Sequence, residues 1–140
     1  MSWDAAKITI ANRDTPRAEA LAADFTTPQL GVRGIGLEAI DRVLAEVSVL
    51  VNATAVGWNL GESPMPLGLL NRLPATAVVN DLIYRETDLL RAARLRGLRI
   101  LDGLPMLVHQ AAGAFTRWTG LTAPLPEMLE AGENARAARR

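Results

Sequence analysis

The sequence predicts an α/β protein with a mostly parallel sheet. Short runs of apolar and β-branched residues alternate with amphipathic stretches of helical length, which is the order expected when helices connect parallel strands. Residues 47–51 are almost continuously apolar, as expected for a strand that is covered on both faces. The length of 140 residues suits one domain over residues 1–140. These observations indicate a Rossmann-type sheet with helices on both of its faces.

The first part of the chain alternates strands and helices. Residues 7–11 form a β-branched run that ends at Asn12-Arg13, which predicts a strand. Thr15 followed by Pro16 predicts a helix start, with the threonine hydroxyl as the cap. The apolar spacing after Pro16 extends this helix to Phe25. The two segments that follow are a second short strand and a second amphipathic helix, expected over 32–36 and 37–47.

The second part begins with the strand over 47–51, which stops at Asn52-Ala53-Thr54. Residues 57–74 are rich in proline, glycine and asparagine, so we expect mostly loop. The remaining segments read as strands at 77–84 and 99–101 and helices at 86–96, about 103–119 and about 124–135.

Composition excludes several classes of function. The formal net charge is zero, so no general attraction to nucleic acid or to an anionic membrane is expected. No cysteine is present, which excludes disulfides, a thiolate nucleophile and thiolate metal ligation. We also find no metal-ligand spacing, serine elbow or P-loop, and no apolar stretch long enough to span a bilayer. Without a secretory signal at the first residues, a cytoplasmic location is the default expectation.

Polar residues follow the predicted strands, where a parallel sheet binds its ligands. Arg13 and Arg17 lie where the first strand ends and the next helix begins, so they are candidates to bind an anion such as a nucleotide phosphate. Asp14 stands between them and would repel a phosphate. The alternative is that both arginines are solvated surface residues.

The helix after Gly103 carries two stripes. The stripe expected to face the core consists of Leu104, Leu107, Val108, Ala111, Phe115 and Trp118. The second stripe, with Gly103, Met106, Gln110, Gly113 and Arg117, could either face a ligand or pack ordinarily. His109 is the only histidine; without an identifiable acidic partner, a structural role is favoured over that of a general base.

Taken together, these segments resemble shikimate dehydrogenase over nearly the whole chain. Residues 8–13 with Arg17-Ala18 resemble the family's Asn-Arg-Thr…Arg-Ala element, and residues 51–54 its Asn-Ala-Thr turn. Residues 63–66 resemble the Ser-Pro-Leu-Pro segment, and residues 81–90 the Asp-x-x-Tyr-Asn-Pro…Glu-Thr-Pro-Leu-Leu region. The most specific match runs from Asp102 through Gln110 to Gly120, with Ala123-Pro124 after it.

The resemblance implies the C-terminal, NADP-binding half of a shikimate/quinate 5-dehydrogenase. It assigns the adenosine end of NADP to Asn12, Arg13 and Arg17, the cofactor groove to Asn52 and Thr54, the nicotinamide to Leu82, Gly103 and Met106, and shikimate to Tyr84 and Gln110. The chain departs from the family's pattern at three places: Asp14 replaces a threonine, Pro105 replaces a glycine, and the Asn-Pro after Tyr84 is deleted.

The resemblance also implies that the chain is N-terminally truncated. The family's catalytic lysine and aspartate, its glycine-rich loop and its first strand precede the matched segments, and that strand is central in the order 3-2-1-4-5-6. We therefore expect a sheet without its central strand, no catalytic residue in this chain, little or no activity alone, and weak or absent NADP binding. A second copy or a companion chain could supply the strand. The alternatives are a non-catalytic nucleotide-binding or subunit-pairing module, or an inactive remnant.

Overall fold

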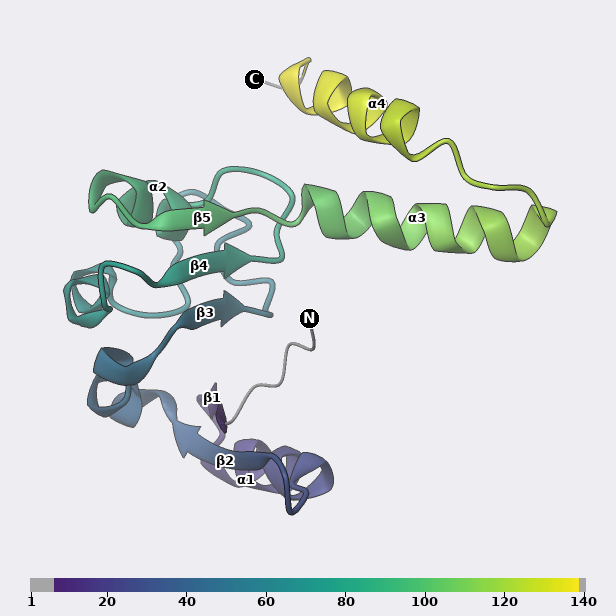
Figure 1. Cartoon of the computed structure of the whole chain (residues 1–140). Coiled ribbons are helices and arrows are strands. Elements are labelled where there is room, and N and C mark those ends of the chain that lie inside the picture. Colours follow the sequence, from purple (N-terminus) through teal and green to yellow (C-terminus); the bar gives the residue numbers. More distant parts are fainter. Residues whose placement is uncertain (1–6, 139–140) are drawn as a thin grey trace. The chain divides into compact units, whose positions relative to one another are not determined.

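The computed structural model describes residues 7–138, which divide into two compact units between Glu46 and Val47 (Figure 1). Each unit contains a parallel sheet, and the strand order is β1-β2 in the first and β3-β4-β5 in the second. The prediction of a parallel α/β architecture is therefore confirmed. Within residues 7–138, no helix is long and apolar enough to cross a membrane.

The first unit is a β-α-β arrangement followed by short turns of 3-10 helix. Its elements are β1 (Lys7–Asn12), α1 (Thr15–Phe25), β2 (Gly31–Gly36), η1 (Leu37–Arg42) and η2 (Leu44–Glu46). The close packing of α1 on β2 depends on Gly34, where an added Cβ would lie 2.3 Å from the backbone of Ala18. Ala18 and Ala22 bury the inner face of α1. Small side chains on both sides thus bring helix and strand together.

Two expectations for this unit are corrected. The cap of α1 is Asp14 and not Thr15, because the Asn12 side chain accepts a hydrogen bond from the Asp14 N–H and turns the chain so that Asp14 Oδ1 accepts from the Arg17 N–H. The helix expected over 37–47 is replaced by η1 and η2. Gly36 offers no side-chain cap, and the β-branched Ile40 and Val43 disfavour a regular helix, so the backbone bonds locally.

The second unit is built on three parallel strands. Its elements are β3 (Val49–Asn52), η3 (Leu67–Arg72), β4 (Val78–Asp81), α2 (Asp88–Leu95), β5 (Arg99–Leu101), α3 (Leu104–Thr119) and α4 (Leu125–Ala137). The η3 turn lies inside the segment expected to be loop. The core of the unit contains Leu70, Val79, Leu89 and Leu90, all almost fully buried.

Helix α3 runs on from β5, and α4 returns alongside it (Figure 1). The stripe expected to face the core is only partly buried. Leu104 and Val108 are buried, because α4 packs closely on them at Gly132. A Cβ added to Gly132 would lie 3.1 Å from Leu104 and 3.3 Å from Val108. Leu107, Ala111 and Trp118 are exposed, the last by 83%. The prediction failed because, in the described part of the chain, α4 is the helix that packs on α3 and it covers one side of it.

Candidate functional site

The carboxyl end of β1 presents two arginines to solvent. Arg13 and Arg17 are exposed, and among residues 7–138 neither forms an ion pair. Between them, Asp14 uses one carboxylate oxygen to cap α1 through the Arg17 N–H, at 3.1 Å. The Asn12 side chain supports this turn by accepting from the Asp14 N–H, also at 3.1 Å. The anion-binding start of α1 is thus already occupied by the chain's own carboxylate.

The carboxyl ends of β3 and β4 are joined by a buried polar network. Asp81 is 0% exposed and accepts hydrogen bonds from Asn52 Nδ2 (3.0 Å), the Ile83 N–H (3.1 Å) and Thr87 Oγ1 (2.8 Å). Thr87 in turn caps α2 by accepting from the Leu90 N–H. The side chains at the ends of two neighbouring strands therefore hold the start of the next helix in place.

Asn52, which is only 4% exposed, makes its hydrogen bonds within this network. Its Nδ2 also donates to the Val56 carbonyl, and its Oδ1 accepts from the N–H and the hydroxyl of Thr54. Thr54 in turn accepts from the Val56 N–H. The Asn-Ala-Thr turn is therefore shaped from inside by Asn52, while Thr54 is the residue of the pair that reaches solvent.

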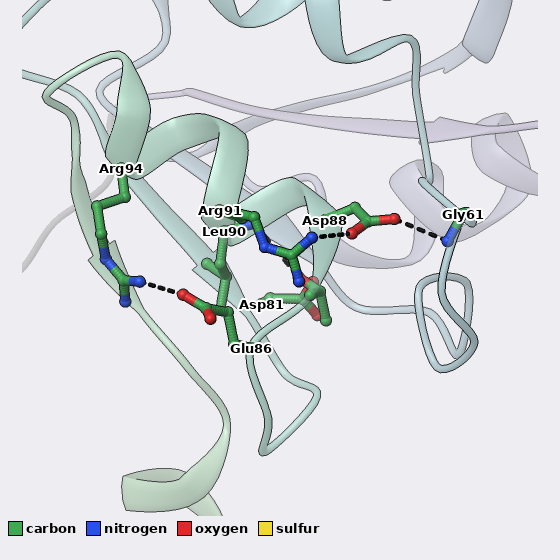
Figure 2. Close-up of polar contacts among 8 residues, drawn as sticks. Gly61, Asp81, Glu86, Asp88, Leu90, Arg91 and Arg94 are labelled. Atoms are coloured by element: carbon green, nitrogen blue, oxygen red, sulfur yellow. Dashed lines mark hydrogen bonds and ion pairs between the residues drawn. The ribbon is translucent and has the colours of Figure 1, made fainter. Parts of the chain in front are cut away.

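A loop over residues 57–62 follows this turn and is organised by Glu62. The side-chain and backbone N–H groups of Asn59 and the Gly57 N–H donate to its carboxylate. These hydrogen bonds, that of the Asn59 side chain first, hold the pKa of Glu62 below its usual value. The Gly61 N–H donates to Asp88 Oδ2 at 2.8 Å, which ties the loop to α2 (Figure 2).

The loop places Trp58 against Tyr84, which follows β4. The ring centroids are 5.4 Å apart in an edge-to-face arrangement, and the Arg85 guanidinium carbon lies 5.5 Å from the Trp58 ring centroid. Trp58 and Tyr84 are 43% and 36% exposed. An aromatic surface with a cation on it therefore stands beside the ends of β3 and β4.

Gly103 brings the start of α3 against the end of β4. An added Cβ would lie 1.9 Å from the Leu82 carbonyl oxygen, and the Gly103 N–H donates to the Ile83 carbonyl at 3.1 Å. Leu82 and Gly103, two of the predicted cofactor residues, are thus in direct contact. Met106 lies in the first turn of α3 and is 37% exposed.

Gln110 is exposed one turn further along α3. Within the described part of the chain no hydrogen bond joins it to Tyr84, the other predicted substrate residue. His109 lines a shallow hollow between α3 and the segment before α4, together with Thr116 and Leu125. Residues 7–138 contain no cluster of side chains that could hold a metal ion.

Sequence reasoning missed the central position of Asp81 and Thr87 and the pairing of Trp58 with Tyr84. A signal for Asp81 was present, since a carboxylate that ends an apolar strand must find buried donors. Nothing in the sequence indicated Trp58, because its position depends on the loop around Glu62.

The fold and the strand ends together define a class of protein. The chain is a parallel α/β protein of Rossmann type with polar residues after β1, β3 and β4. Comparison with known proteins then adds the family resemblance. The profile of the Shikimate 5'-dehydrogenase C-terminal domain matches residues 103–131. This chain is similar to the C-terminal part of shikimate dehydrogenases.

The relatives support this statement over most of the chain. Shikimate dehydrogenase (NADP(+)) of Azorhizobium caulinodans is 47% identical, with 83% of this chain and 40% of the relative covered. That of Methanothrix thermoacetophila is 41% identical, with 99% and 49% covered. The chain thus spans about half the length of the curated relatives it matches.

Solved structures agree. Shikimate 5-dehydrogenase of Thermus thermophilus, in complex with NADP(H) and shikimate, is 40% identical with a TM-score of 0.73, over 91% of this chain and 45% of that one. Quinate dehydrogenase of Corynebacterium glutamicum, in complex with NAD, is 34% identical with a TM-score of 0.76, over 89% and 45%.

Proposed function

We propose that this chain is the nucleotide-handling part of an NADP-linked oxidoreductase that interconverts 3-dehydroshikimate and shikimate. The observation that carries the proposal is the 40% identity and common fold with the Thermus thermophilus enzyme, which was solved with NADP(H) and shikimate. Its cofactor and substrate are carried over to this chain as part of the proposal.

Each predicted site residue has a place in this proposal. Arg13 and Arg17, supported by Asn12, bind the phosphate of the adenosine end. Thr54 lines the cofactor groove, and Asn52 holds its turn. The residues assigned to the nicotinamide and to shikimate lie after β4 and β5 and on α3. They are Leu82, Gly103 and Met106 for the nicotinamide, and Tyr84 and Gln110 for shikimate.

The charged side chains at the start of α1 affect the binding of a phosphate in two opposite ways. Two arginines without an ion pair among residues 7–138 suit a phosphate. The Asp14 carboxylate stands on the same turn and repels one. Pro105 lacks an N–H and fixes φ in the first turn of α3, so this segment keeps its shape when the ring binds. When bound, the nicotinamide supplies or takes up the hydride; the chain's own residues bind and orient.

We further propose that this chain does not turn over alone. The resemblance places the catalytic lysine and aspartate outside the segments that match. Lys7, the only lysine of the sequence, is paired with Glu46 at 3.3 Å. A non-catalytic, subunit-pairing module is the second candidate. It is supported by the free edges of β1 and β3, since within residues 7–138 each is paired on one side only.

The test is thermal unfolding of the chain with NADP, NAD and no nucleotide, combined with an assay of shikimate oxidation. We expect a small rise in Tm that appears only at high NADP concentration, and no turnover, because a ligand that binds the native state weakly stabilises it by mass action only when its concentration exceeds its Kd. Turnover without a companion polypeptide would contradict the second part of the proposal. If no nucleotide changes the Tm, the proposed nucleotide binding is contradicted and an inactive remnant is favoured.

A further inference from the structure

Arg85 lies beside the proposed substrate residue Tyr84 and has no acidic partner among residues 7–138. It immediately follows Tyr84 and is partly buried, with its guanidinium against the Trp58 ring. The chain is two residues shorter here than the Asp-x-x-Tyr-Asn-Pro pattern, so the arginine directly follows the tyrosine. An arginine on an aromatic face is oriented by that face while its N–H groups remain available.

The neighbouring carboxylates are already used. Glu86 pairs with Arg94, and Asp88 binds both Arg91 and the Gly61 N–H (Figure 2). Within the described chain, Arg85 itself forms no ion pair. The positive charge of this segment is thus neutralised at two positions and left free at the one that lies on Trp58.

Hydrogen bonds fix both the loop that carries Trp58 and the turn that carries Arg85. Glu62 closes the loop that carries Trp58, and Asp88 anchors the loop to α2. On the other side, the turn with Tyr84 and Arg85 lies between Asp81 and Thr87, whose side chains are hydrogen-bonded at 2.8 Å. Both segments are therefore fixed before a ligand arrives, which lowers the entropy cost of binding one.

We propose that Arg85, beside Tyr84, binds the carboxylate of a cyclic hydroxy acid, and that Trp58 is a positioning residue holding Arg85 toward it. This proposal rests on the proposed function for the class of substrate, and it goes further by assigning the carboxylate to a residue the family pattern does not contain. The three side chains stand beyond the carboxyl ends of β3 and β4, where a parallel sheet binds ligands.

The test compares shikimate with its methyl ester, which keeps the ring and hydroxyl groups but has no charge. Binding of each to the 140-residue chain in the presence of NADP is measured by calorimetry. We expect Arg85→Gln to weaken shikimate binding by about tenfold and to leave ester binding unchanged, because only the acid forms a charge-assisted hydrogen bond. Arg72→Gln is the matched control: Arg72 is exposed and lies before the amino end of β4, so neither ligand should respond.

The role of Trp58 is tested by the affinities for the same two ligands, shikimate and its methyl ester. Trp58→Leu should weaken shikimate several-fold more than the ester, and Trp58→Phe should restore most of the difference, because phenylalanine keeps an aromatic face under the guanidinium. A merely structural role would lower the affinity for both ligands equally.

The outcomes separate this inference from the proposed function. If the wild-type chain binds acid and ester equally, or if Arg85→Gln weakens both alike, the role of Arg85 is wrong while the substrate class stands. If the wild-type chain binds neither ligand although NADP still raises its Tm, the inference falls together with the substrate assignment, and only the cofactor part of the proposal survives.

Discussion

The end of β1 and the ends of β3 and β4 use their polar residues in opposite ways. At the end of β1 the charged side chains are exposed, and the arginines have no acidic partner among residues 7–138. At the ends of β3 and β4 the polar atoms are buried and hydrogen-bonded to one another. The first arrangement leaves charge available for a ligand, whereas the second fixes the backbone. Substitutions of polar residues at the end of β1 should therefore mainly change ligand binding, whereas those at the ends of β3 and β4 should mainly change stability.

The largest effect is expected at Asp81. Replacing it by alanine leaves Asn52, Ile83 and Thr87 without their buried acceptor, so Asp81→Ala should lower the free energy of unfolding by about 3 kcal/mol or more. Urea denaturation measures the change. Asp24→Ala, at an exposed position of α1, is the control and should stay within about 0.5 kcal/mol. A loss at Asp81 no larger than at Asp24 would mean that the network does not hold these strand ends.

Gly103 should be the next most sensitive position. Its Cβ would lie 1.9 Å from the Leu82 carbonyl oxygen, which is backbone and cannot turn aside, so Gly103→Ala should cost about 2–3 kcal/mol. The same change at Gly113, in the middle of α3 with nothing within 4 Å, should stabilise by about 0.5–1 kcal/mol. Thermal unfolding of both variants gives the comparison, and equal effects would contradict it.

Asp14 tests the open end of β1. Asp14→Ala removes the cap of α1 and should cost about 1 kcal/mol, whereas Asp14→Asn keeps an acceptor for the Arg17 N–H and should cost little. Because Asp14→Asn removes the negative charge between the two arginines, it should raise the affinity for adenosine 2′,5′-bisphosphate by about threefold and leave adenosine unaffected. Calorimetric titration of both ligands decides; an unchanged bisphosphate affinity would show that this turn does not bind the phosphate.

The smallest effect is expected from the ion pairs. Arg136 of α4 pairs with Asp102, whose other oxygen accepts from the Leu104 N–H, and all these groups are half-buried or better. Arg136→Ala should cost at most about 1 kcal/mol, and less at high salt. Lys7→Ala should change nothing measurable, because Lys7 and Glu46 are 54% and 77% exposed. A larger loss of stability from Lys7→Ala than from Arg136→Ala would contradict the view that the less exposed ion pair contributes more.

The sequence predicted the positions of the strands and of α3, because their apolar runs and the polar residues that end them are local signals. The strand expected over 77–84 is shorter, at Val78–Asp81, and the strand expected to be covered on both faces leaves Val49 and Val51 57% and 47% exposed. The prediction failed at 37–47, where the lack of a side-chain cap at Gly36 and the β-branched residues favoured 3-10 turns. It also failed at Asp14, because the cap depends on how the Asn12 side chain turns the chain. It overestimated the burial of Leu107 and Trp118, since helical periodicity shows which residues share a face but not whether another element covers it. The Trp58–Tyr84 contact joins two separate loops and left no pattern to recognise.

The tight approach at Gly103 also has a mechanical consequence. Helix α3 contains 16 residues and is therefore about 24 Å long, so a tilt of about 10° at its first residue would carry its last turn through about 4 Å. Helix α4 packs along it and would travel with it. Because there is no room for even a methyl group at the pivot, a sub-ångström adjustment at the tip of β4 would displace the whole helical hairpin.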